Sequence, residues 1–186
     1  MNKALAAALI AALAVAGCSS TRKEYKAAKE KNPGLCPNVL VLRDASRLVD
    51  FNGEQKAEDI AWTAEIENAT LACRYYGDKP IEAEVKLNIA FGKGPKADAS
   101  SHQYVYWVAV TRTDREVITK QEYAVPVKFG DGESVKRVEQ DINKIIIPRA
   151  NDTISGSNFE IIIGLDLTPA QAIFNRSGKS LKFPDL

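Results

Sequence analysis

From Cys36 onward, apolar and polar residues alternate along much of the chain with a period of two. The clearest run covers residues 81–91, where every second residue is apolar and the residues between them include Glu82, Glu84, Lys86 and Asn88. Successive side chains of a strand point to opposite faces of a sheet. This pattern therefore predicts a half-buried β-strand whose charged residues face solvent.

Two neighbouring segments extend the prediction. Residues 60–66 alternate in the same way, and Asn68-Ala69 then predicts a turn into residues 71–75, so we expect a hairpin here. Residues 104–110 are apolar on both faces, which is typical of a strand in the middle of a sheet.

Proline and β-branched residues help to assign the later strands. Residues 117–129 predict a strand, and Pro126, which has no N–H to donate, favours an edge position for it. Residues 135–147 also fit helical spacing, but three β-branched isoleucines at the end of the segment favour a strand. Residues 159–167 alternate again and predict the last strand.

The chain is expected to close with a short helix. Thr168 can cap its N-terminus, Pro169 suits the first helical position, Gln171 completes a capping box, and Gly178 can end it. The residues predicted to dock this helix are Ala172, Ile173 and Phe174.

About eight strands joined by short turns, without alternating strands and helices, predict an all-β fold. We expect an antiparallel immunoglobulin-like β-sandwich with a short C-terminal helix. The second architecture is a lipocalin-type barrel, which would enclose a ligand. The Gly-x-Trp pattern of lipocalins is absent, because neither Trp62 nor Trp107 has a glycine two positions earlier.

The N-terminus has the pattern of a secretory signal. Lys3 precedes 13 apolar residues, 4–16, which would form a helix of about 20 Å and are too few to span a bilayer. The stretch Val15-Ala16-Gly17-Cys18 resembles a bacterial lipobox, which implies acylation of Cys18 and cleavage before it. An ordinary signal peptide with unmodified Cys18 is the alternative. The expected organisation is a signal peptide at 1–17, a lipidated basic tether at 18–34 and one sandwich domain at 35–186.

The tether carries five basic and two acidic residues. It can be a solvated linker near anionic headgroups or a peptide that docks on a partner, with Arg22, Tyr25 and Lys26 as contact residues. Several acyl chains on one cysteine would anchor the chain durably. Ser19 follows Cys18, and by resemblance to Gram-negative lipoproteins the lack of Asp there implies the outer membrane.

Cys36 and Cys73 are predicted to form a disulfide, because an exported chain enters an oxidising compartment. A redox or metal pair is the alternative. It would have no CxxC spacing and only one histidine in the chain to complete a site. We therefore expect no metal site.

The search for chemistry gives no catalytic residue. The chain has 25 Lys and Arg against 24 Asp and Glu, so it lacks the basic excess of a nucleic-acid binder. It contains no P-loop, GxGxxG, Gly-x-Ser-x-Gly or His-Glu-x-x-His pattern. His102 is predicted to be a surface residue, and Glu82 with Glu84 a solvated face. We expect no enzyme activity and no cofactor.

An aromatic cluster of Tyr104, Tyr106 and Trp107, together with Tyr75 and Tyr76, has two interpretations. Core packing is favoured. If part of the cluster is exposed, it becomes the candidate protein-contact surface, because Tyr and Trp are enriched at interfaces.

The lipobox, the Cys36-Pro37 opening, the all-β body and the closing Leu167-Thr168-Pro169-Ala170-Gln171 together resemble a family of small outer-membrane lipoproteins of alphaproteobacteria. The stretch Arg22-Lys23-Glu24-Tyr25-Lys26 resembles the tail of accessory lipoproteins of the β-barrel assembly machinery. These resemblances imply a non-enzymatic envelope scaffold on the periplasmic face of the outer membrane, with envelope proteins as partners. The alternative is a carrier for a lipid or other apolar ligand in a lipocalin-like barrel.

Overall fold

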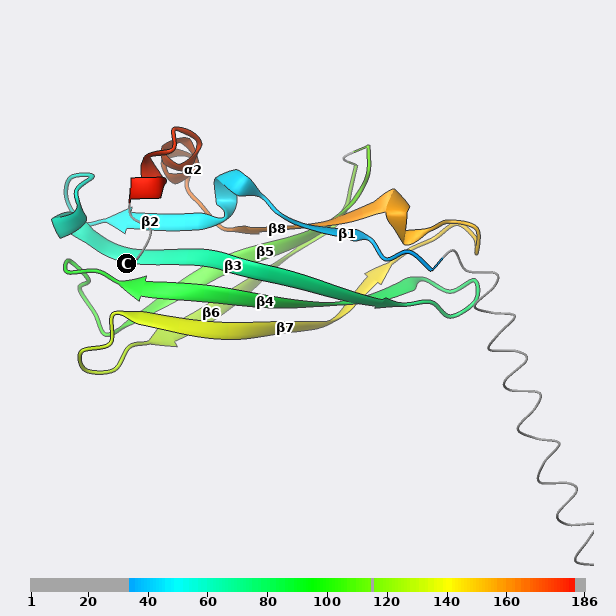
Figure 1. Ribbon diagram of the computed structural model, residues 1–186, viewed down its shortest axis with the longest axis horizontal. Coiled ribbons are helices and arrows are strands. Elements are labelled where there is room, and N and C mark those ends of the chain that lie inside the picture. Colours follow the sequence, from blue (N-terminus) through cyan, green and yellow to red (C-terminus); the bar gives the residue numbers. More distant parts are fainter. Residues whose placement is uncertain (1–33, 115, 183–186) are drawn as a thin grey trace, which may run out of the picture.

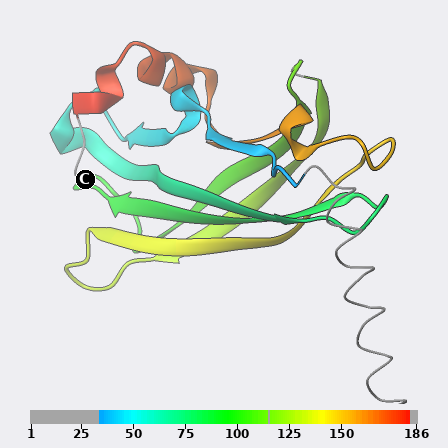
Figure 2. The same cartoon turned by 45° about the vertical axis from the view of Figure 1, so that its right-hand side comes forward.

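The computed structural model describes residues 34–114 and 116–182, which form two facing β-sheets of four strands each (Figures 1 and 2). One sheet, sheet A, has the strand order β1-β8-β5-β6, and the other, sheet B, has the order β2-β3-β4-β7. The strands are β1 (Asn38–Val41), β2 (Arg47–Phe51), β3 (Ile60–Arg74), β4 (Ile81–Lys93), β5 (Ser101–Arg112), β6 (Val117–Lys128), β7 (Val135–Ile147) and β8 (Phe159–Leu165).

Most of the pairing is antiparallel, as the short turns of the sequence predict. The exception is the short β1, which runs parallel to β8. Strand β5 lies between β6 and β8, and β6 is an edge strand, so the central position of residues 104–110 and the edge position indicated by Pro126 are both confirmed. Residues 135–147 form β7, so the strand prediction is confirmed there too.

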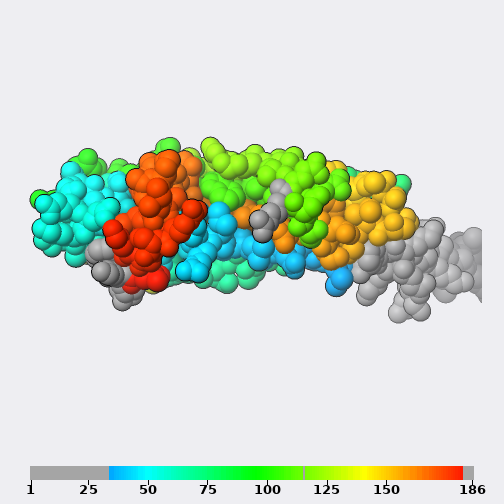
Figure 3. Space-filling model, turned by 90° about the horizontal axis from the view of Figure 1, so that it is seen from above, coloured from blue at the N-terminus to red at the C-terminus, as the bar shows by residue number. Residues whose placement is uncertain are grey.

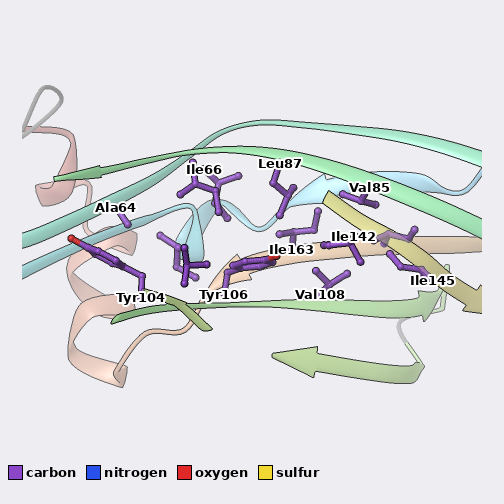
Figure 4. Close-up of a cluster of buried hydrophobic side chains, with 14 of the residues drawn as sticks. Ala64, Ile66, Val85, Leu87, Tyr104, Tyr106, Val108, Ile142, Ile145 and Ile163 are labelled. Atoms are coloured by element: carbon purple, nitrogen blue, oxygen red, sulfur yellow. The ribbon is translucent and has the colours of Figure 1, made fainter. Parts of the chain in front are cut away.

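The interior is filled by side chains from the inner faces of both sheets (Figure 4). In β4 every second residue from Ile81 to Phe91 is at most 1% exposed, which confirms the predicted half-buried strand. The described strands form two separate sheets and no closed barrel, so the lipocalin-type architecture is not the fold. The all-β sandwich is confirmed.

The predicted hairpin at Asn68-Ala69 is wrong. Residues 60–74 form the single strand β3, which pairs with β4 along its length and carries a bulge between Ile66 and Asn68. Before the bulge the even-numbered Trp62 and Ala64 are buried, whereas after it the odd-numbered residues are the more buried ones. A bulge adds one residue to one strand and so shifts the inward phase by one. The sequence shows this phase shift, which we interpreted as a turn.

The C-terminal helix α2 (Pro169–Arg176) is present with its predicted capping box, in which the Thr168 hydroxyl accepts from the Gln171 N–H. Phe174 docks the helix. It is 7% exposed and meets Phe51 of β2 edge to face at a centroid distance of 5.6 Å. Ile173 is 65% exposed, so its predicted docking role is wrong. In Figure 3 the orange-to-red C-terminal segment lies against the blue and cyan N-terminal part of the domain.

Candidate functional site

Two of the three predicted contact aromatics lie in the core. Tyr104 and Tyr106 are each 2% exposed and point into the space between the sheets (Figure 4). Burial raises the pKa of Tyr106 to about 12 and raises that of Tyr104 further. The Tyr104 hydroxyl donates to the Gly92 carbonyl at 3.0 Å. The contact surface proposed for these two tyrosines is therefore wrong, and the core packing that the sequence favoured is confirmed.

Trp107 lies on the other face of β5, outside the core. Its indole covers Gly164, where an added Cβ would come within 2.6 Å of the ring, and its Nε1–H donates to the Leu165 carbonyl at 3.2 Å. The Lys120 ammonium lies 5.3 Å from the ring centroid. This half-buried indole is the one predicted contact aromatic on the outer surface of sheet A.

The end of the domain next to the tether is held by a covalent bond. Cys36 and Cys73 form the predicted disulfide, with their Cα atoms 5.6 Å apart. It joins the residues before β1 to the end of β3. On the chain-entropy model, closing a loop of this length contributes about 4 kcal/mol to the free energy of unfolding.

Tyr75, a member of the predicted aromatic cluster, and Arg149, which the sequence did not single out, strengthen the same end. The Tyr75 hydroxyl donates to the Leu35 carbonyl and accepts from the Gly156 N–H at 2.7 Å. Arg149 lies over the Tyr75 ring, 5.1 Å from its centroid, and donates to backbone carbonyls of two loops, those of Gly77, Lys79, Asp152 and Ile154. No local pattern marks Arg149, because its partners lie up to 72 residues away in the sequence.

His102 packs in an aromatic cluster instead of lying free on the surface. Its ring stacks on Trp62 at 4.7 Å and meets Tyr104 edge-on at 4.6 Å. Burial lowers the pKa of His102, and this effect outweighs the opposing influence of Asp50 and Asp98. The predicted surface position is thus only partly right, since the ring is half-buried. Its contacts are those of a packing residue.

The outer face of sheet B is covered with cross-strand ion pairs. Glu84 pairs with Arg74 at 3.1 Å, so the solvated face predicted for Glu82 and Glu84 is confirmed. The Lys86 ammonium lies 3.1 Å from Asp141 and 3.3 Å from Glu139, and its hydrogen bond to Asp141 is the main cause of its raised pKa. Exposed pairs of this kind contribute little to stability and keep the face hydrated.

The two sheets leave a groove between their edge strands β6 and β7, the lower strands in Figure 1. The groove has a volume of about 300 Å³, and its walls are Ala124, Val125, Pro126, Val127, Lys128, Lys136, Val138 and Gln140. The Lys136 ammonium crosses the groove and donates to the Lys128 carbonyl at 2.7 Å. Sequence analysis missed this groove, because it depends on how far apart two distant strands lie.

The remaining predicted site residues, Cys18, Arg22, Tyr25 and Lys26, lie outside the described residues. Within residues 34–114 and 116–182 there is no cluster of three or more potential metal-ligating side chains. In the same part of the chain no helix is both long and apolar enough to cross a membrane. No family model, curated protein or solved structure matches this chain.

Proposed function

We propose that this chain is an outer-membrane lipoprotein, anchored through Cys18, whose periplasmic domain acts as a non-enzymatic scaffold for other envelope proteins. The observation that carries the proposal is the Cys36–Cys73 disulfide, because disulfides persist in oxidising compartments such as the periplasm. It lies only two residues after the proposed tether. A mechanical force transmitted along the tether would therefore act on the disulfide before it acted on β1.

The interior favours contact through surfaces over storage of a ligand. Large side chains such as Phe91, Leu87 and Ile163 are at most 1% exposed and occupy the space between the sheets. The carrier alternative depended on a lipocalin-like barrel, and we do not pursue it. The immunoglobulin-like assignment remains part of the proposal, supported by two facing four-stranded sheets between which the chain crosses after β1, β4, β6 and β7.

The anchor can be tested directly. Mass spectrometry of the chain purified from native envelopes should show an acylated N-terminal Cys18, with the protein in the outer-membrane fraction. The Cys18→Ala variant should lose the modification and leave the membrane fraction. An unmodified Cys18 in a soluble wild-type chain would refute the anchor.

The scaffold role needs a second experiment. The lipidated chain is recovered from cross-linked, mildly solubilised envelopes, and co-purified proteins and small molecules are identified. We expect envelope proteins, including members of the β-barrel assembly machinery, whose recovery falls when Arg22, Tyr25 and Lys26 are replaced by Ala. A stoichiometric lipid without any protein partner would overturn the scaffold in favour of a carrier.

A further inference from the structure

The groove between β6 and β7 has apolar walls, and the ammonium of Lys136 crosses it. No carboxylate lines the groove. Lys128 contributes its backbone carbonyl, which accepts from the Lys136 ammonium, whereas its side chain lies on the exposed face of β6, opposite the buried Val125 and Val127. The carboxylate of Glu133 lies 3.7 Å from the Lys136 ammonium and also accepts from the Gly130 N–H at 2.8 Å.

Strand β7 exposes an unpaired backbone edge beside this groove. The Lys93 N–H donates to the Ser134 carbonyl, so in the antiparallel β4–β7 ladder the even-numbered residues Lys136 and Val138 direct their backbone groups toward β4. The odd-numbered residues between them direct theirs to the open side. Among the described strands β7 pairs with β4 alone, so Val135, Arg137, Glu139 and Asp141 direct their backbone groups to the open side. The Glu139 carbonyl accepts there from the Gln140 side-chain amide at 3.3 Å, a bond that an incoming strand would replace.

The facing edge of β6 is less suited to pairing. The Phe129 N–H donates to the Ser100 carbonyl, so the odd-numbered residues of β6 bond to β5 and the even-numbered ones face the open side. Pro126 is one of these even-numbered residues and has no N–H to offer. An incoming strand would therefore pair with β7 and pack its side chains against β6.

We propose that β7 binds an extended, acidic segment of a partner protein, which adds a strand to sheet B and places a carboxylate beside the Lys136 ammonium. Strand addition of this kind obtains affinity from main-chain hydrogen bonds and specificity from alternate side chains. The proposal deepens the scaffold role proposed above and rests on it for the class of partner.

The position of Lys136 decides which strands can bind. In β7 the even-numbered side chains of Lys136, Val138 and Gln140 point toward the interior layer. An added strand would take the Lys136 ammonium out of water. The one carboxylate that this ammonium already has nearby, that of Glu133, is 3.7 Å away, beyond hydrogen-bond distance. A strand that brings a carboxylate within hydrogen-bond distance of Lys136 is therefore favoured over one that does not. A second copy of β7 would bring its own Lys136, Val138 and Gln140 to this layer and no carboxylate. Charge complementarity therefore selects an acidic partner over a second copy.

The test uses the full chain in mild detergent and a synthetic heptapeptide, Lys-Val-Thr-Val-Thr-Glu-Thr, whose Glu is opposite Lys136 in the antiparallel register. We expect saturable binding, and about tenfold weaker binding for Lys136→Glu. A peptide with Lys in place of Glu should bind the wild type weakly and Lys136→Glu better. Lys144→Glu is the matched control, because Lys144 is an exposed residue of β7 outside the groove lining.

Hydrogen exchange supplies a readout that a nonspecific charge effect would not change. Bound peptide should slow exchange of the amides of Arg137, Glu139 and Asp141 by about tenfold or more and leave those of Lys136 and Val138, already bonded to β4, unchanged. Absent binding, equal binding of the two peptides, or unchanged exchange at the three odd-numbered amides would overturn the proposal. Concentration-dependent dimerisation that protects the same amides would overturn it in favour of a second copy. Cys18 acylation and envelope pull-down do not depend on this peptide, so the two proposals can fail separately.

Discussion

The strand edges on the two long sides of the sandwich are protected in different ways. On the side of β1 and β2, the disulfide joins the segment before β1 to β3, and helix α2 packs on β2 and on a short 3-10 helix at Arg43–Ala45. There the Asn175 amide donates to the carbonyls of Asp44 and Arg47, at 2.9 and 2.7 Å. On the side of β6 and β7, two long edge strands flank an open groove.

The difference shows two solutions to the same problem. An exposed strand edge can pair with another chain, and proteins limit this by covering the edge or by placing proline and charge on it. On the side of β1 and β2, which we call the closed side, the edge strand β2 packs against helix α2, a segment distant in the sequence. The open side uses Pro126 and Lys136, which restrict pairing without removing it. Stability should therefore depend mostly on the closed side and recognition on the open one.

The largest expected effect concerns the covalent link of the closed side. Replacing both cysteines, Cys36→Ser with Cys73→Ser, should lower the free energy of unfolding by about 4 kcal/mol, because the bond no longer restricts the unfolded chain. Denaturant titration measures this, and the reduced wild type should match the double variant. A loss below about 1 kcal/mol would contradict a closed side held mainly by this bond.

The next effect concerns the docking of α2. Phe174→Ala should cost about 3 kcal/mol, because it removes a buried ring packed on Phe51 and leaves a cavity. Ile173→Ala, one residue away on the exposed face, is the control and should change stability by less than about 0.5 kcal/mol. Equal losses in both variants, measured by urea unfolding, would show that the helix does not dock as described.

A pH titration of stability tests whether the interior next to β6 raises the pKa of a buried tyrosine. Tyr106 stacks on Tyr123 of β6 at 5.0 Å, and burial raises the pKa of Tyr106 to about 12. The unfolded chain releases this proton near pH 10, so stability is complete below about pH 10 and falls as the pH rises toward 12. Tyr106→Phe should flatten part of this fall in alkaline unfolding curves. An unchanged slope would contradict a pKa of Tyr106 raised by burial.

The smallest effect on stability concerns the edge of β6. Pro126→Ala restores an outward N–H without removing a buried contact, so unfolding should shift by less than about 0.5 kcal/mol. Self-association, followed by light scattering, should rise because the edge gains a donor. Ala124→Ser, on the same outward-facing row, is the control and should leave association unchanged. If Pro126→Ala associates no more than this control, Pro126 does not guard the edge.

The sequence predicted the strands that depend on local alternation, and it predicted the capping box at Thr168 and the pairing of Cys36 with Cys73. It failed where the outcome depended on a second segment. The phase shift after Ile66 is compatible with a turn or a bulge, and only continuous pairing with β4 decides between them. Likewise Tyr106 and Trp107 are neighbouring aromatic residues on opposite faces of β5, and only the position of sheet B makes one of them interior.

By itself, then, the sequence determined the all-β class, the strands β4 to β8 and the helix that closes the chain, because periodicity and capping involve residues a few positions apart. It did not single out β1 and β2, and it divided β3 into a hairpin. The tertiary structure decided which face of β5 is buried, that Phe174 and not Ile173 docks α2, and that Lys136 and Pro126 border one groove. Those outcomes depend on distances between strands that are far apart in the chain, and no local pattern encodes such distances.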